Sequence, residues 1–252
     1  MLPNCELVNA FGTQYLVFKG RDLISNALKQ GGYEIEVFGI AQKILQKHED
    51  GVVLDIGANL GSFTLPLAKS NPHLTFHAFE PQRIIYYQLC GNTLINGLDN
   101  VHCHNFGLSN KRDRFEIVVP DYANETNIGA FSIDKEVRET EYECPTQGAK
   151  ETMVVFPLDD GQHANVRLIK IDVEGHELEV IKGGIETIKY NKYPPIIFEA
   201  WTWKPWYQEK RTALFDYLKG HGYEITEGIN SNNLAQHPDH GEMLKWLSQF
   251  RL

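Results

Sequence analysis

The chain has 252 residues, 42% of them hydrophobic and 23% charged, and its 24 basic and 33 acidic side chains give a net charge of −9. This composition is typical of a folded globular protein and excludes an intrinsically disordered chain. The acidic excess argues against nucleic acid as a partner, because affinity for nucleic acid depends largely on Lys and Arg contacts to phosphates. The sequence contains no apolar run long enough to span a membrane, no secretory signal, and no close pair among its four cysteines. We therefore expect a cytoplasmic protein without membrane insertion.

The first part of the chain, residues 1–50, is predicted to form a small adapter. Strands at 5–10 and 14–18 flank a turn at 11–13, a pattern typical of a hairpin. After Tyr33, apolar residues at three- and four-residue spacing predict a helix that ends near residue 50.

Residues 51–252 are predicted to form the main domain, in which short apolar strands alternate with helices. We expect strands at 52–54, 73–79, 101–106, 166–171, 196–198 and 223–226, and helices around 63–68, 84–94, 177–189 and 211–219. Alternation of this kind indicates an α/β fold with a mostly parallel sheet and helices on both faces.

A β-rich insertion at 108–160 interrupts this alternation. Its predicted strands, 115–119 and 152–156, are separated by the acidic run 134–143, and no strong helical pattern is present. The acidic run is consistent either with a solvated surface segment or with a lid over the edge of the sheet, since long connections in compact domains are often functional.

A glycine-rich turn joins the first strand of the main domain to its helix. It reads Asp55-Ile56-Gly57-Ala58-Asn59-Leu60-Gly61-Ser62. Its glycines let the backbone approach a ligand closely, and the start of the helix offers free N–H groups. Phe63 and Thr64 stand where a dinucleotide-binding loop has its third glycine, and Asp55 would repel a phosphate. The turn therefore favours a cofactor that carries an amine and a sulfonium.

Glu80 is a second candidate for a cofactor contact. It follows the strand 73–79 and precedes Pro81. At the carboxyl end of this strand, a carboxylate can accept hydrogen bonds from both hydroxyls of a ribose. Nicotinamide cofactors and S-adenosylmethionine both contain a ribose, so Glu80 alone does not separate them, whereas the glycine turn does.

A third group of titratable residues, Asp172, Glu174 and His176, follows the buried strand 166–171. The carboxyl ends of strands form the edge at which open α/β sheets bind ligands. Groups crowded there are expected to perturb one another's protonation, as is common at functional sites.

The segments DIGANLGSFT, FEP around Glu80, LDD at 158–160, KIDVEGHE and PPIIFE occur in this order within about residues 33–200. Together they resemble the FkbM family of S-adenosylmethionine-dependent methyltransferases. The resemblance implies a class I methyltransferase fold, with a seven-stranded, mostly parallel, Rossmann-like sheet that ends in an antiparallel hairpin. It also implies S-adenosyl-L-methionine as cofactor, S-adenosyl-L-homocysteine as product, and O-methylation of a hydroxyl on a sugar, a glycan or another small natural-product scaffold.

On this resemblance, the glycine turn, Glu80 and the end of the third strand align the cofactor. Asp172 is expected to orient the cofactor amine or the substrate. The expected cofactor-binding residues are Asp55, Gly57, Ala58, Asn59, Gly61, Ser62, Phe63, Thr64, Glu80, Pro81, Asn105, Gly107 and Asp172.

Methyl transfer to a hydroxyl requires a group that removes its proton, because an alkyl hydroxyl is far too weak an acid to ionise near neutral pH. His176 is the first candidate for this base, since a neutral imidazole accepts a proton, although at a helix start it can equally serve as a cap. Glu174 is the competing base. Glu199, after the strand 196–198, is expected at the same edge, where it either binds a substrate hydroxyl or is a surface acid.

The same acidic residues raise the question of a metal. Asp172, Glu174 and Glu199 are oxygen ligands of the kind that Mg²⁺ accepts, but no tight spacing requires an ion. His102 and His104 share one face of a strand and are interpreted as ordinary strand residues. No metal site is therefore predicted, and Mg²⁺ is left as an open alternative.

Residues at the edges of the strongest motifs are candidates for acceptor binding. Trp201 and Trp203 follow Glu199, and if the strand continues they point the same way and form an apolar wall for a sugar ring. Large aromatic residues also anchor cores, so a structural role is an equal alternative. Asn127 and Ser132 belong to a loop that resembles the family's N-x-G-x-x-S segment and is expected to close over the acceptor.

We therefore predict an O-methyltransferase with a small-molecule or glycan acceptor. One alternative is a nicotinamide-dependent oxidoreductase, against which the missing third glycine counts. Another is a non-catalytic module that binds S-adenosylmethionine without turnover. The sequence leaves a monomer and a homodimer both open.

Overall fold

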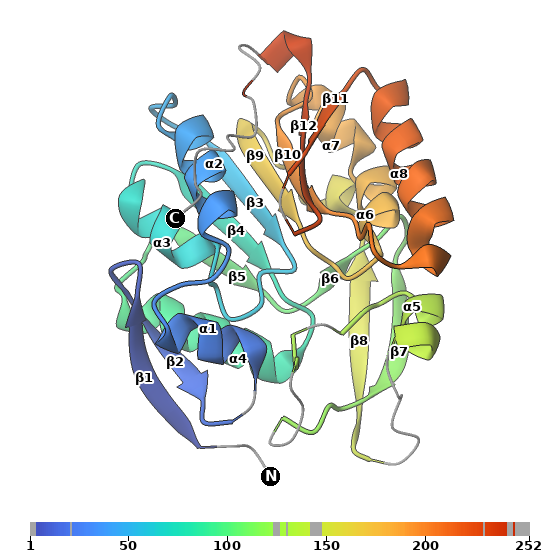
Figure 1. Cartoon of the computed structure of the whole chain (residues 1–252). Coiled ribbons are helices and arrows are strands. Elements are labelled where there is room, and N and C mark those ends of the chain that lie inside the picture. Colours follow the sequence, from blue (N-terminus) through green and yellow to red (C-terminus); the bar gives the residue numbers. More distant parts are fainter. Residues whose placement is uncertain are drawn as a thin grey trace.

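The computed structural model describes residues 4–20, 22–122, 127–129, 131–141, 148–228, 230–240 and 244. Its centre is a seven-stranded sheet with the order β11-β12-β10-β9-β3-β4-β5 (Figure 1). All neighbouring pairs are parallel except the two that include β12. This confirms the expected mostly parallel sheet with a terminal antiparallel hairpin. The strands are β3 (Val52–Ile56), β4 (Thr75–Phe79), β5 (Val101–His104), β9 (Val166–Ile171), β10 (Ile196–Glu199), β11 (Glu224–Glu227) and β12 (Asn232–Gln236).

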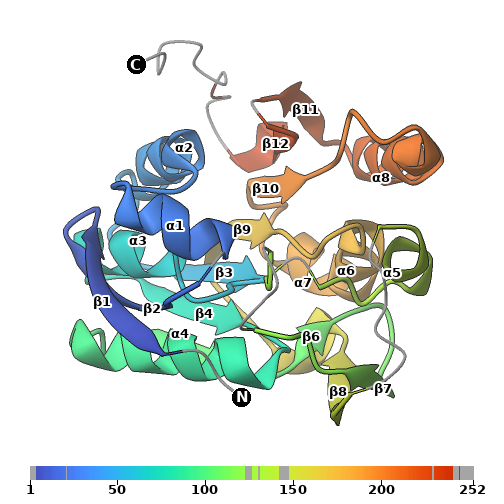
Figure 2. The same ribbon diagram turned by 60° about the horizontal axis from the view of Figure 1, so that its bottom comes forward.

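Helices cover both faces of this sheet, and its central strands, β3 and β9, are therefore buried along almost their whole length. Burying each Leu, Ile or Val side chain between sheet and helix contributes about 1.5–3 kcal/mol. Figure 2 shows α2 and α3 on one side of the sheet and α6, α7 and α8 on the other. Within the described ranges, no helix is both long and apolar enough to cross a membrane. The core helices are α2 (Ile35–Leu45), α3 (Thr64–Ser70) and α4 (Arg83–Ile95) on one face, and α6 (Glu177–Gly183), α7 (Ile185–Tyr190) and α8 (Gln208–Gly220) on the other.

The N-terminal segment is a hairpin that is docked on the main domain. β1 (Cys5–Ala10) and β2 (Thr13–Phe18) pair antiparallel, as predicted. β2 lies against α4, where the side chain of Asn96 exchanges two hydrogen bonds with the backbone of Gln14, at 3.0 and 2.7 Å. These bonds attach the outer edge of the hairpin to the helix that follows β4.

The insertion forms a second, three-stranded sheet beside the main one. Its strands are β6 (Gly107–Leu108), β8 (Lys150–Phe156) and β7 (Asp113–Val118), adjacent in this order. The prediction that the acidic run contains no helix is wrong, because α5 (Lys135–Glu141) lies within it. Asp134 caps this helix by accepting hydrogen bonds from the backbone N–H groups of Glu136 and Val137. The end of the acidic run, residues 142–143, lies outside the described residues.

Other elements also differ from the prediction. The sequence does not indicate α1 (Leu23–Lys29), because seven residues are too few to show a helical repeat. Nor does it indicate β12, whose sequence NNLAQ lacks the β-branched and aromatic residues typical of strands and which is held by pairing with β10 and β11. The single helix expected at 177–189 is divided at Gly184 into α6 and α7.

Candidate active site

The carboxyl ends of β3, β4, β9 and β10 surround a cavity. The chain leaves β3 for β4 on one side, whereas β9 lies on the other side, so the loops diverge and leave a crevice between them. The cavity lies in this crevice. The predicted cofactor residues on its wall are Gly57, Ala58, Asn59, Ser62, Glu80, Pro81, Gly107 and Asp172.

The glycine turn after β3 is wedged between the ends of two neighbouring strands. The N–H groups of Gly57 and Ala58 donate to the carbonyl of Phe79 at 3.0 and 2.9 Å. Gly57 has a φ of +87°, and a Cβ atom at this position would lie 1.8 Å from the carbonyl oxygen of Asp172. Only glycine therefore permits this close approach between the turn and the chain that follows β9.

Asp55 does not line the cavity, which corrects its expected role as a cofactor contact. Its side chain is fully buried beneath the turn, where Oδ2 accepts a hydrogen bond from Thr64 Oγ1 at 2.5 Å. Lys170 Nζ lies 3.9 Å from Oδ1 of the same carboxylate. Asp55 thus fixes the start of α3 to β3. Gly61, Phe63 and Thr64 are also buried behind the turn and are absent from the cavity wall.

Glu80 lies at the cavity wall with both carboxylate oxygens held by the backbone. Oε2 accepts from Asn59 N at 3.0 Å and Oε1 accepts from Gln82 N at 2.8 Å. Burial raises the pKa of Glu80 to about 7, although these two hydrogen bonds favour the ionised form. A carboxylate has about four acceptor positions, so Glu80 can still accept hydrogen bonds from two ligand hydroxyls.

Asn105 lies beside this cavity rather than in its wall. Its Nδ2 donates to the carbonyl oxygens of Glu80 and Pro81, at 3.0 and 3.3 Å. Asn105 therefore fixes the turn that carries Glu80, and it does not line the cavity with the other expected cofactor-binding residues.

The insertion contributes a cover to the cavity. Asn127, Gly129 and Phe131 lie in its wall. The segment is attached to the end of β4 by a hydrogen bond of 3.0 Å from Gln82 Nε2 to the carbonyl of Ile128. The part of the insertion that covers the sheet edge is thus this loop, which precedes the acidic run.

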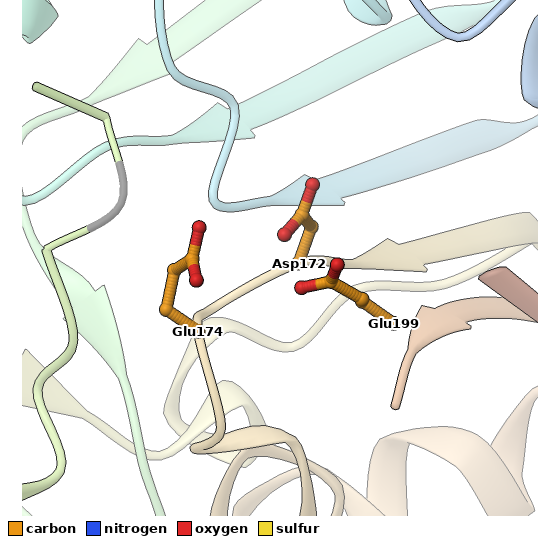
Figure 3. A group of neighbouring side chains, drawn as sticks. All are labelled: Asp172, Glu174 and Glu199. Carbon is orange, nitrogen blue, oxygen red and sulfur yellow. The ribbon is translucent and has the colours of Figure 1, made fainter. Parts of the chain in front are cut away.

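Asp172, Glu174 and Glu199 come together at one side of the cavity, as their places after β9 and at the end of β10 suggested. Each offers a carboxylate oxygen, and these oxygens lie within 4.8 Å of one another (Figure 3). Lys170 Nζ, which is buried, lies 3.0 Å from Asp172 Oδ2. Burial opposes the charge on Lys170, but the neighbouring Asp172 and Asp55 carboxylates raise its pKa.

Crowding of acidic groups shifts the protonation of the other two carboxylates. Burial, followed by the charges of Asp172 and Glu177, raises the pKa of Glu174 to about 8. Burial and the charges of Asp172 and Glu174 raise the pKa of Glu199 well above its usual value. Lys204 and Lys170 act in the opposite direction on Glu174.

The same three carboxylates have the chemistry to hold a hard divalent cation. Mg²⁺ binds carboxylate oxygens in proteins, and one ion could contact all three groups at this spacing. Lys170 already supplies a positive charge next to Asp172. A metal is therefore not needed to balance that carboxylate, and Mg²⁺ stays an alternative that chelation can test.

A second cavity, of about 570 Å³, adjoins the first. This volume lies within the range of 300–1,000 Å³ that is common for sites of small molecules. Tyr33, Glu34, Asn127, Glu174 and Glu199 line both cavities. A molecule in the second cavity would therefore lie next to a ligand in the first, across the group of carboxylates.

Trp201 and Trp203 both line the second cavity, but they do not form the expected continuous wall. β10 ends at Glu199, so the alternation of a strand does not extend to these residues. Trp201 is 3% exposed and packs 4.9 Å from the ring of Tyr207, whereas Trp203 is 59% exposed. Trp201 is thus mainly a core residue, and Trp203 stands at the mouth of the cavity.

His176 and Ser132 lie away from both cavities. His176 Nε2 is 2.9 Å from Ser109 Oγ, and the ring faces a hollow formed with Asp134 and Lys210. The structure thus separates His176 from the carboxylates with which the sequence groups it. Ser132 is fully buried, and its Oγ accepts a hydrogen bond from Asp134 N ahead of α5. Neither residue has the position that base or acceptor contact requires.

Several residues in the cavity walls were not identified from the sequence. Tyr33 and Glu34 come from the adapter, and Gln82 follows Glu80. Lys170 could have been identified from the sequence, since a lysine inside the apolar run of β9 is unusual unless it is paired. Glu34 could not, because only the folded chain brings the adapter to this edge of the sheet.

The sheet order, the glycine turn after the first strand of the domain and the carboxylate after the second define the architecture of class I methyltransferases, which use S-adenosylmethionine. Residues 55–251 match the family model described as the Methyltransferase FkbM domain. The chain therefore belongs to the FkbM family of S-adenosylmethionine-dependent methyltransferases. This assignment excludes the alternative prediction that the protein is a nicotinamide-dependent oxidoreductase.

The chain is also similar to individual proteins. The chain is 27% identical over 146 residues to Methyltransferase 1 of Beauveria bassiana, covering 54% of this chain and 59% of that protein. The chain thus spans less than two thirds of that relative's length. It is 27% identical over 198 residues to Methyltransferase sdnD of Sordaria araneosa, covering 69% of this chain and 74% of the relative. Among solved structures, precorrin-6y C5,15-methyltransferase from Geobacter metallireducens matches with a TM-score of 0.46 and 14% identity, over 82% of this chain and 93% of the other.

Proposed function

We propose that this methyltransferase transfers the methyl group to a hydroxyl of a sugar, a glycan or another small acceptor. The observation that carries the proposal is the position of Glu174 and Glu199, which line the cofactor cavity and the adjoining cavity at once. A hydroxyl in the second cavity would thus have a carboxylate beside it and the methyl donor in front of it.

In this proposal, Glu174 is the general base. S-adenosyl-L-methionine supplies an electrophilic methyl group on a sulfonium. The acceptor oxygen forms the new bond to this methyl group as its bond to sulfur breaks, and the hydroxyl proton passes to the Glu174 carboxylate. A base whose pKa is raised to about 8 matches this task better than one with an ordinary carboxyl pKa.

The other residues of the site align the reactants. The turn at Gly57 and the carboxylate of Glu80 hold the donor, and Asp172, paired with Lys170, accepts a hydrogen bond from its amine. Glu199 holds the acceptor hydroxyl. The loop with Asn127 and Phe131 excludes water from the reacting atoms, which favours transfer to the acceptor over side reactions.

The test is mass spectrometry of a panel of methyl glycosides, other small alcohols and small amine and carbon acceptors incubated with the protein and S-adenosylmethionine. Glu174→Gln is expected to lower kcat by about 10²–10⁴, the usual contribution of a general base, with unchanged affinity for S-adenosylhomocysteine. Glu186→Gln is a matched control, because Glu186 pairs with Lys189 on the surface of α7 and lines neither cavity. Methylation of nitrogen or carbon alone would contradict the proposal, and binding without any turnover would favour a non-catalytic module.

A further inference from the structure

We propose that Glu34 and Asn232 bind the acceptor and select uncharged, polyhydroxylated molecules over phosphorylated ones. This inference rests on the proposed function, because it assigns residues to the acceptor side of the same site. It concerns the adapter, which precedes the main domain, and β12, which lies near the end of that domain.

Glu34 lies where the two cavities meet. It precedes α2 and has left-handed backbone angles, with a φ of 52° and a ψ of 48°. Its side chain lines both cavities, as does that of Tyr33. The adapter therefore supplies a carboxyl group directly opposite the ends of β9 and β10, although none of the motif segments includes it.

Asn232 fixes the carboxyl group of Glu34. It is 5% exposed at the start of β12, and its Nδ2 donates to Glu34 Oε1 at 3.4 Å. Among the described residues, the second oxygen of Glu34 accepts no hydrogen bond from the protein. One oxygen is thus held in place while the other is available to a hydroxyl of a ligand.

The charges around the second cavity favour a neutral ligand. Among its described lining residues, Glu34, Glu36, Glu174 and Glu199 carry carboxyl groups, and Lys204 carries the single amine. The Lys204 Nζ lies 3.6 Å from the centre of the Trp201 ring. Ionised carboxylates accept hydrogen bonds from sugar hydroxyls and repel a phosphate, so at a pH at which Glu34 is ionised we expect the cavity to favour the sugar over the phosphate.

The size and the aromatic rim agree with a sugar. A cavity of about 570 Å³ accommodates one or two sugar rings. Trp203, exposed at its mouth, offers a flat apolar surface to the C–H face of a ring, while the acids and Asn232 contact the hydroxyls.

The experiment compares neutral methyl glycosides with their 6-phosphates as acceptors, at about pH 8.5, where Glu34 is ionised because burial raises its pKa only to about 7. For the wild type we expect kcat/KM to be at least about tenfold higher for the neutral member of each pair. Glu34→Gln is expected to raise the acceptor KM about tenfold with kcat within about threefold, and to narrow the discrimination against phosphate. Asn232→Ala is expected to raise the same KM by a smaller factor.

Two controls keep the outcome clear. Glu49→Gln changes an exposed acid outside both cavities and is expected to leave all constants unchanged. Affinity for S-adenosylhomocysteine reports whether each variant keeps its fold. Equal use of phosphorylated and neutral acceptors, or an unchanged KM for Glu34→Gln, would overturn this inference while leaving O-methyl transfer intact. Failure of the wild type to methylate any acceptor, with cofactor binding preserved, would instead overturn the proposed function.

Discussion

Replacing Glu80 by Gln exchanges one carboxylate oxygen for an NH₂ group and tests whether Glu80 binds the ribose of the cofactor. In the native protein both oxygens of Glu80 accept backbone hydrogen bonds, from Asn59 N at 3.0 Å and Gln82 N at 2.8 Å. The amide of Gln has one oxygen and one NH₂ group, so one backbone donor would face another donor. A buried donor without a partner costs about 1–3 kcal/mol, and we expect Glu80→Gln to lower the free energy of unfolding by this amount.

The effect on cofactor affinity adds to the effect on stability. A ribose hydroxyl that donates to a carboxylate forms a charge-assisted hydrogen bond, which contributes about 1.5–3 kcal/mol. Its loss corresponds to a dissociation constant for S-adenosylhomocysteine that is about 10- to 150-fold higher in Glu80→Gln.

The pH dependence of binding separates this contact from general damage. Because burial raises the pKa of Glu80 to about 7, a ligand that needs the ionised form binds less tightly as the pH falls below 7. Isothermal titration of S-adenosylhomocysteine between pH 6 and pH 8 should show this loss in the wild type and a smaller one in Glu80→Gln. Equal affinities and equal pH profiles for the two proteins would refute the assignment of Glu80 to the ribose.

Three further predictions address the turn, the pH stability and the metal. Gly57→Ala should lower the free energy of unfolding by about 2–4 kcal/mol and abolish binding of S-adenosylhomocysteine in the same titration, because its Cβ would lie 1.8 Å from a carbonyl oxygen at a positive φ; near-native binding would contradict this. The rings of His77 and His104 are in contact at 2.9 Å, and burial and the charge of His163 lower their pKa values to about 4. Their contribution to the free energy of unfolding is therefore complete above pH 6.5 and is lost as the pH falls from 6.5 to 4. Because the two rings are partly exposed, we expect the free energy of unfolding, measured with urea, to fall by about 1–2 kcal/mol more over this pH range in the wild type than in His77→Leu. Parallel dependences of this free energy on pH in the two proteins would refute the prediction. Methyl transfer should persist in excess EDTA, since Lys170 balances Asp172, and restoration of lost activity by Mg²⁺ would instead establish a metal at Asp172, Glu174 and Glu199.

The fold and part of the wall of the first cavity were predictable where neighbours in sequence determine the geometry. The turn at Gly57 and the acid at Glu80 each follow a short apolar strand, and the parallel arrangement of β3 and β4 brings the two ends together. Asp172 and Glu174 follow from the same rule. These residues line the cavity because strand direction, which the sequence pattern reveals, decides where they lie.

Other assignments failed because a side chain's direction depends on partners far away in sequence. Asp55 is in the correct strand, but Thr64 and Lys170 hold it beneath the turn. His176 follows the correct strand, yet it turns to Ser109, 67 residues earlier. The orientation of Trp201 depended on the last residue of β10, which pairing with β12 sets.

The acceptor side was the least predictable part of the site. Its wall joins Glu34 of the adapter to Asn232 of β12, two residues separated by 198 positions. The polar strand β12 has no pattern that indicates its structure, and the sequence places Glu34 only at the start of a helix, so the contact between Glu34 and Asn232 at the sheet edge becomes visible only in the fold.

A crystal structure with bound S-adenosylhomocysteine tests most directly whether this crevice is where the methyl donor lies. We expect the ribose hydroxyls on the Glu80 carboxylate and the sulfur facing Asp172, Glu174 and Glu199, with the second cavity open in front of it. A ligand bound elsewhere, or a sulfur atom turned away from these three carboxylates, would contradict the account.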